Sequence, residues 1–334
     1  MIPLSLWNAD HLVGLNSTDQ IAVNWPVSGL NDVKSTFVTS NSTNTVVDVG
    51  GQNELNVSCN SSSGSNMYFW LPTINEMVSW GFSRVYSGFR FRCNAVNTSA
   101  RFLYFNNGVY GLTAAANTVF VIEVITDCET KTRKAYVNGT QVTNVPTGLN
   151  DRIAIGSGGS IRILSSSNHS MNLMDMYTIV TDPATDPNPP DRIGTMIVRS
   201  APVVSVTNDE RFEVIGGGSV VDALNAPRTS GADLSHGVIT DPNGSAMSVK
   251  FERPAVVPEG VIGATVMLST ALSPEDAGDP VTVTATAGDA VMEMMPVAAV
   301  PMQDYQSTPL GGVEVWDADA IANVSLSIRS NKLE

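Results

Sequence analysis

The residue types that most often carry catalysis are scarce in this chain and stand far apart. Its three histidines are His11, His169 and His236, and none lies in a His-Glu-x-x-His or Gly-x-Ser-x-Gly pattern. We therefore interpret them as surface or loop residues. The run Gly216-Gly217-Gly218 is too short for a phosphate loop, because the second glycine spacing and the terminal Lys-Ser/Thr are missing. A tight turn is the better interpretation, and the sequence predicts no catalytic residue.

The candidate metal ligands do not form a recognised set. Cys59, Cys93 and Cys128 are widely separated and match no zinc spacing, so free thiols are expected. Oxygen ligands for calcium occur between residues 182 and 191, but no glycine-turned loop with a closing glutamate surrounds them. These oxygens belong to Asp182, Asp186, Asn188 and Asp191. No metal and no cofactor is predicted.

Aromatic side chains are the remaining candidates for a binding site. Tyr68, Trp70 and Trp80 lie in the densest aromatic region, and exposed rings at such spacing could stack on sugars. The same rings could instead fill the space between two facing sheets. Phe89, Phe91 and Cys93 alternate as in a half-buried strand, which favours the core interpretation. Both interpretations stay open.

Strands joined by turns must position all these residues. Val119 to Ile125 is β-branched or aromatic except for Glu123, a composition typical of a buried strand. Two short strands then flank Asn138-Gly139, which predicts a type I′ hairpin. No segment keeps apolar residues at helical spacing for three turns, so the sequence predicts an all-β fold.

The central motifs resemble those of concanavalin-like jelly rolls in structural proteins of tailed bacteriophages. The resemblance is carried by Tyr136-Val137-Asn138-Gly139, by Asp175 to Val180, and by Ile193 to Val198 after a polar loop. The run Trp316 to Ile321 extends it to the last strand. The resemblance implies a non-enzymatic virion component in a tail fibre, tail tip, collar or capsid decoration. It also implies other virion proteins as partners, and a homo-oligomer.

Glycoside hydrolases of the concanavalin-like fold present Glu-x-Asp-x-x-Glu on a strand, so that alternate carboxylates face one cleft. The chain contains no such triplet. Asp209-Glu210 and Glu213 come nearest, but their spacing differs and they lie outside the jelly-roll half. We therefore expect a protein that is not an enzyme. The alternative is a lectin-like module that recognises a host glycan through Tyr68, Trp70 and Trp80.

Composition suggests two domains. Residues 181–191 carry four prolines, which predicts a stiff linker at 182–191 between a jelly roll at 1–181 and a smaller β domain at 192–334. Residues 1–190 carry 13 acids and 10 bases, whereas 191–334 carry 19 acids and 8 bases. Such acidity disfavours nucleic acid and anionic membranes as partners. Short helical turns are expected at 219–226 and at 317–323, the latter capped by Asp317.

Overall fold

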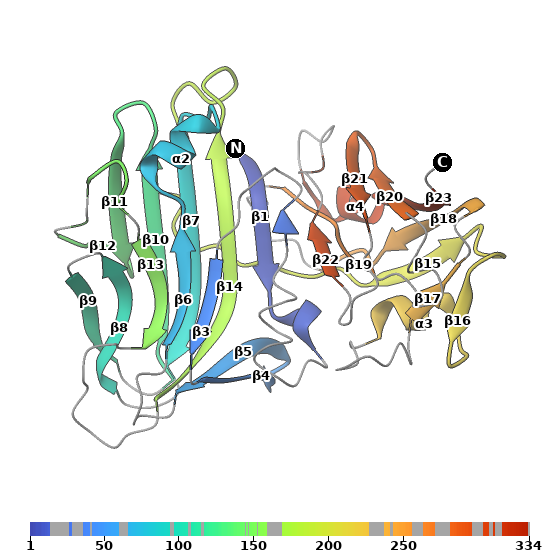
Figure 1. Cartoon of the computed structure of the whole chain (residues 1–334), viewed down its shortest axis with the longest axis horizontal. Coiled ribbons are helices and arrows are strands. Elements are labelled where there is room, and N and C mark those ends of the chain that lie inside the picture. The colour runs from blue at the N-terminus through green and yellow to red at the C-terminus, as the bar shows by residue number, and fades with distance from the viewer. Residues whose placement is uncertain are drawn as a thin grey trace. The chain divides into compact units, whose positions relative to one another are not determined.

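The chain divides into two compact units in a computed structural model (Figure 1). Unit 1 comprises Met1–Ala22 and Val33–Val198, and unit 2 comprises Val23–Asp32 and Arg199–Glu334. The structure describes residues 1–13, 27–28, 36–40, 42–59, 66–93, 97–105, 108–114, 117–143, 145, 147–151, 153–158, 169–226, 237–240, 243–255, 263–270, 281–295, 303–306, 310 and 316–332. The segment 182–191, expected to be a linker between domains, lies within unit 1, which extends to Val198.

Unit 1 contains two antiparallel sheets. In the eight-stranded sheet the spatial order is β12-β11-β10-β7-β14-β5-β4, and β1 also pairs with β14. Its strands are β1 (Ile2–Asn8), β4 (Ser42–Val49), β5 (Gln52–Cys59), β7 (Arg84–Cys93), β10 (Val119–Asp127), β11 (Thr132–Val137), β12 (Thr140–Gln141) and β14 (His169–Thr181). The five-stranded sheet has the order β3-β6-β13-β8-β9. Its strands are β3 (Thr36–Ser40), β6 (Asn66–Leu71), β8 (Asn97–Phe105), β9 (Gly108–Ala114) and β13 (Ile153–Gly158).

The connections of unit 1 follow a jelly-roll pattern. From β3 to β14 the chain passes repeatedly between the two sheets, so that neighbours within a sheet are mostly distant in sequence. Figure 1 shows β10, β7, β14 and β1 side by side, in agreement with their pairing. The predicted all-β jelly-roll sandwich followed by a second β unit is confirmed.

The predicted central hairpin is present and its turn is explained by two residues. Asn138 and Gly139 have φ angles of 49° and 82°, the left-handed values that a type I′ turn requires at both central positions. Strand β10 precedes the hairpin, and its side chains from Ile122 to Ile125 are all buried. Glu123 is among them, with only 1% of its surface exposed.

The core of unit 1 is rich in large aromatic side chains. Trp7, Phe89 and Phe91 are fully buried, and the two phenylalanine rings stack with centroids 6.2 Å apart. Arg133 of β11 reaches away from its sheet and donates hydrogen bonds to the carbonyls of Pro72, which follows β6, and Asp151, which precedes β13. Burial lowers the pKa of Arg133 to about 10. The side chain therefore ties the two sheets together.

A short helix in unit 1 was not predicted from the sequence. Helix α2 (Ile74–Ser79) begins with a capping box, in which Thr73 accepts from the amide of Glu76 while Glu76 accepts from that of Thr73. The pattern Thr-x-x-Glu is the sequence signature of this arrangement. Its brevity hides it from a search for helical periodicity, because a helix of 6 residues completes fewer than two turns.

Unit 2 has a five-stranded sheet with the order β15-β18-β23-β20-β21. Smaller sheets join β16 to β17, and β19 to β22 and β2. The strands are β2 (Val27–Ser28), β15 (Val203–Thr207), β16 (Glu213–Ile215), β17 (Gly237–Ile239), β18 (Asn243–Phe251), β19 (Met267–Thr270), β20 (Val281–Ala287), β21 (Ala290–Met294), β22 (Gln303–Gln306) and β23 (Ser325–Lys332). The core gathers valine, alanine and methionine side chains around Trp316.

The helical turns predicted for unit 2 are confirmed. Helix α3 (Val220–Asn225) is capped by Ser219, and α4 (Ala318–Ala322) is capped by Asp317 as expected. Gly216 to Gly218 form a turn in which all three φ angles are positive. Asn225, at the end of α3, accepts a hydrogen bond from the amide of Val203 and donates one to the same residue's carbonyl. The side-chain amide of Asn225 therefore covers part of the unpaired edge of β15.

No helix among the described residues combines the length and the apolar character that crossing a membrane requires. Within the same residues, no group of three or more His, Cys, Asp or Glu side chains is placed to hold a metal ion. Cys128 is a free, buried thiol, as predicted, and burial raises its pKa to about 11. The side chains of Cys59 and Cys93 lie outside the described part of the chain.

Candidate functional site

Strand β7 presents two chemically different faces. Phe89 and Phe91 point into the core of unit 1, on the side where Arg133 reaches the five-stranded sheet. The alternate positions Arg84, Tyr86, Gly88, Arg90 and Arg92 share the opposite side, because neighbouring residues of a strand face opposite ways. We call this side of the eight-stranded sheet its outer face.

Three carboxylates on neighbouring strands complement the basic residues of the outer face. Glu54 of β5, Glu123 of β10 and Asp175 of β14 have 0%, 1% and 1% of their surfaces exposed. Arg92 donates to both oxygens of Glu54 at 2.8 to 3.1 Å, and Arg90 forms an ion pair with Asp175. Asn172 of β14 adds a hydrogen bond of 2.7 Å to Glu54. Buried charges need such partners, so these pairs make the face a stable polar layer.

Residues 189–198 run over this face without regular secondary structure, and we call them the strap. Pro190 begins the contact, because its carbonyl accepts hydrogen bonds from the Tyr86 hydroxyl and, at 2.8 Å, from Arg84. The carbonyl of Pro189 accepts a second bond from Arg84 at 3.2 Å. The sequence predicts a strand over Thr195 to Arg199, but the described part of the chain supplies it with no paired strand. Side chains of the sheet hold the strap in place of strand pairing.

Glu123 is the central anchor of the strap. One of its carboxylate oxygens accepts hydrogen bonds from the amides of Ile193 and Gly194 at 2.7 and 3.0 Å. The other oxygen accepts a hydrogen bond from Nε of Arg192 at 3.0 Å. Gly194 has a φ of +84°, which is in the left-handed region. Successive amides that converge on one acceptor beside a left-handed residue form an anion-binding nest. The carboxylate therefore recognises three consecutive residues of the strap.

The guanidinium of Arg192 is held by the central hairpin as well as by Glu123. It lies over the ring of Tyr136, 4.5 Å from the centroid, and donates to the carbonyl of Gly139 at 3.2 Å. A cation over an aromatic ring gains electrostatic stabilisation beyond its ion pair. The hairpin thus forms one wall of the site.

Strand β14 holds the second half of the strap. The hydroxyl of Tyr177 donates to the carbonyl of Gly194 at 3.0 Å, and the amide of Val198 donates to Asp175 at 3.1 Å. The Tyr177 ring lies directly on Gly88 of β7, where a Cβ atom would clash with it. Burial raises the pKa of Tyr177 well above its ordinary value, so the hydroxyl stays protonated and can donate.

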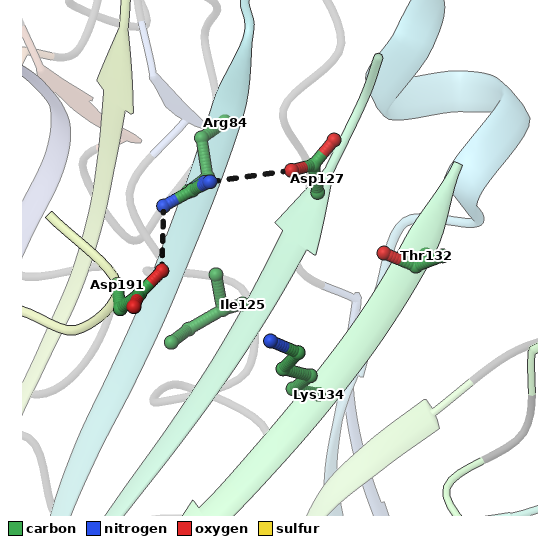
Figure 2. Close-up of a pocket in the computed structure, with 6 residues that line it drawn as sticks. All are labelled: Arg84, Ile125, Asp127, Thr132, Lys134 and Asp191. Carbon is green, nitrogen blue, oxygen red and sulfur yellow. Dashed lines mark hydrogen bonds and ion pairs between the residues drawn. The ribbon is translucent and has the colours of Figure 1, made fainter. Parts of the chain in front are cut away.

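A small pocket lies beside the start of the strap (Figure 2). Its volume is about 30 Å³, far below the roughly 300–1,000 Å³ of pockets that bind small-molecule ligands. Arg84 points between Asp127 and Asp191, at 3.3 and 3.6 Å from their carboxylates. The remaining lining residues are Ile125, Thr132 and Lys134. The pocket is a local ion-pair site and offers no room for a glycan.

The predicted glycan-binding residues lie away from the strap. Tyr68 and Trp70 are in β6 of the five-stranded sheet, and their side chains lie outside the described part of the structure. Trp80 follows α2 and is half-buried. Asp182 and Asp186, considered as calcium ligands, accept hydrogen bonds from the amide of Ala184 and from the N-terminal amine instead.

The other sequence candidates are the histidines and the acidic residues near 210. The side chains of His11 and His169 and the whole of His236 lie outside the described residues. Asp209, Glu210 and Glu213 are in unit 2, where Glu210 and Glu213 are exposed. Sequence reasoning missed the outer face, although the alternation Arg84-x-Tyr86-x-Gly88-x-Arg90-x-Arg92 is the pattern of a polar strand face.

No protein-family model and no curated protein matches this sequence. Among solved structures, similarity extends to a sialidase at 9% identity, covering 44% of this chain and 17% of that chain, with a TM-score of 0.29. An alginate lyase of polysaccharide lyase family 7 is 9% identical over 53% of this chain and 100% of that chain, with a TM-score of 0.31. The binding domain of botulinum neurotoxin serotype C1 is 10% identical over 98% and 96%, at 0.32. At such scores these similarities carry no argument about function.

Proposed function

We propose that the chain is a non-enzymatic structural component of a tailed-phage virion and acts by assembly. The observation that carries this proposal is the covered outer face of unit 1. Its buried carboxylates bind the strap and the arginines of the sheet, so in the described structure they do not line an open cleft. Paired carboxylates that cleave sugars need space for substrate and water between them.

The residues that carry the phage resemblance also make the contacts of the strap. Tyr136 supports Arg192, Tyr177 binds the carbonyl of Gly194, and Asp175 binds the amide of Val198. The three motifs, which are distant in sequence, thus serve one structural purpose, the fixing of the chain where it leaves the jelly roll. Such a role suits a protein built into a particle, and it supports a position in a tail fibre, tail tip, collar or capsid decoration.

Glycan recognition is the second candidate function, favoured by one observation. Trp80 remains half-buried at the end of α2, where part of its ring surface is available to a ligand. A glycan array with the purified protein tests this candidate. Binding that is lost in Trp80→Ala or Trp70→Ala, with the circular dichroism spectrum unchanged, would place glycan recognition first.

Mass spectrometry of purified phage particles tests the proposed function directly. Peptides of this chain should be present at a stoichiometry that fits a symmetric assembly, and sedimentation of the recombinant protein should show a homo-oligomer. A stable monomer that is absent from particles would contradict the proposal. Hydrolysis of sialosides or cleavage of alginate by the purified chain would contradict its non-enzymatic part.

A further inference from the structure

Glu123 differs from the other buried carboxylates of the outer face in the origin of its partners. Glu54 is bound by Arg92 and Asn172, and Asp175 is bound by Arg90, so each keeps a partner from the sheet itself. Every hydrogen bond that the Glu123 carboxylate accepts within the described structure comes from Arg192, Ile193 or Gly194 of the strap. Without the strap this buried carboxylate would have no compensating donor.

We propose that the outer face is a peptide-binding site and that the strap is its resident ligand. The ligand class is a peptide with the pattern Arg-x-Gly. The arginine is read by Glu123, by the Tyr136 ring and by the carbonyl of Gly139. The glycine is needed because its φ of +84° is a conformation that other residues rarely adopt. This turn directs the carbonyl of Gly194 to the Tyr177 hydroxyl, while the amides of Ile193 and Gly194 bind one carboxylate oxygen.

Apart from the ion pair of Arg84 with the exposed Asp191 at 3.6 Å, the remaining contacts involve only the main chain of the ligand and therefore accept other side chains. Tyr177 binds the carbonyl of Gly194, and Arg84 and Tyr86 bind that of Pro190. Specificity therefore lies in the arginine and the glycine, and the flanking residues add affinity. The strap of a second copy presents the same groups, so we assign it as the partner in trans; this part rests on the proposed assembly function.

The first test measures whether Glu123 holds the strap. Trypsin cleaves after arginine. Arg192 is bound to Glu123, whereas Arg199 nearby is exposed, so the rate of cleavage after Arg199 serves as the reference for cleavage after Arg192. In Glu123→Gln, cleavage after Arg192 should accelerate at least tenfold relative to cleavage after Arg199. The matched control is Glu54→Gln, an equally buried carboxylate whose partners lie in the sheet, and it should leave the ratio unchanged. Continued protection of Arg192 in Glu123→Gln would overturn the proposal.

A second variant keeps this test decisive if Glu123→Gln does not fold. Ile193→Pro removes one amide donor from the strap and changes no residue of the sheet. It should speed hydrogen exchange at the amide of Gly194, and exchange is the readout here because trypsin does not cleave an Arg–Pro bond. Wild-type exchange at Gly194 in Ile193→Pro would overturn the proposal.

The third test measures recognition in trans. A fluorescein-labelled peptide with the sequence of residues 187–199 is titrated into the full chain carrying Ile193→Pro, and fluorescence anisotropy should show saturable binding. Peptides carrying Arg192→Ala or Gly194→Ala should bind at least tenfold more weakly. Absence of binding, or equal binding of all three peptides, would overturn the proposal. Because no phage particle is used, this result is independent of the test of the proposed function.

Discussion

Unit 1 and unit 2 place their charges in opposite ways. Unit 1 has the smaller excess of acids, yet it buries Glu54, Glu123, Asp175 and Arg133. Unit 2 carries most of the negative charge, and Ser330 is the one buried polar residue in its described part. The net charge of a unit therefore does not indicate whether its charged side chains are buried and contribute to the fold. Unit 1 adds specific paired charges to its apolar core, whereas the described part of unit 2 is held by apolar packing.

The largest expected effect comes from removing one partner of a buried ion pair. Arg90→Met leaves Asp175 buried without its cation, which should lower the free energy of unfolding of unit 1 by about 3–5 kcal/mol. Chemical denaturation followed by hydrogen exchange mass spectrometry resolves the two units. The control is Arg253→Met in unit 2, whose partner Asp319 is exposed, and no measurable change is expected there. Equal effects of both substitutions would remove the contrast between the units.

A second test concerns the contact between Gly88 and the Tyr177 ring. Gly88→Ala places a methyl group against a ring that is only 2% exposed and is fixed by its hydrogen bond to Gly194. We expect a loss of about 3 kcal/mol in the stability of unit 1. Gly88→Ala combined with Tyr177→Leu should recover part of this loss, since the smaller side chain makes room. Ser205→Ala, at an exposed position of β15, should have no effect on unit 1.

The third test concerns apolar packing in unit 2. Met294 is fully buried, so Met294→Ala should leave a cavity and lower the stability of unit 2 by about 2 kcal/mol. Its neighbour Met295 is 67% exposed, and Met295→Ala is the matched control with no expected loss. Thermal unfolding with unit-resolved hydrogen exchange measures both. A destabilisation of unit 1 by Met294→Ala would show that the two units do not unfold independently.

The smallest expected effect is a dependence on pH in unit 1. Burial alone would raise the pKa of Asp127, but hydrogen bonds from Thr130 and Arg84 outweigh it and hold the pKa below its ordinary value. Because the native pKa is lowered, the ionised Asp127 stabilises the fold above about pH 4. This stabilisation is lost as the pH falls through the native pKa. Asp127→Asn should therefore cost less than about 1 kcal/mol at neutral pH and flatten the loss of stability below pH 4. Asp289→Asn, in an exposed turn of unit 2, should leave the profile unchanged.

Local features of the fold were predictable from the sequence. The hairpin at Asn138-Gly139 follows from two residues that tolerate positive φ, and the cap at Asp317 follows from its hydrogen bond to a nearby amide. The all-β class follows from the absence of helical periodicity. Each depends on neighbours within a few positions, which a single sequence displays directly.

The outer face was not predictable, because its contacts join residues far apart in the chain. Arg90 and Asp175 are separated by 85 positions, and Glu123 and Gly194 by 71. Strand register pairs Arg90 with Asp175, and the path of the strap brings Gly194 to Glu123; no local pattern encodes either contact. The four prolines between Thr181 and Asp191 predict a stiff extended segment, whereas the chain there begins with a turn in which the amides of Thr185 and Asp186 donate to the carbonyl of Asp182. They cannot reveal that Tyr86 and Arg84 bind that segment to the sheet.

The amide of Asn225 has a consequence for how the chain can associate with other molecules. It imitates one residue of an adjoining strand, since it donates to and accepts from Val203 at the margin of β15. An incoming strand would have to displace this side chain before it could extend the sheet there. Proteins often cover exposed strand edges, and this prevents aggregation by strand pairing between molecules. The covered edge of β15 therefore disfavours the addition of strands from other molecules. Ordered association of the chain is expected to use other surfaces.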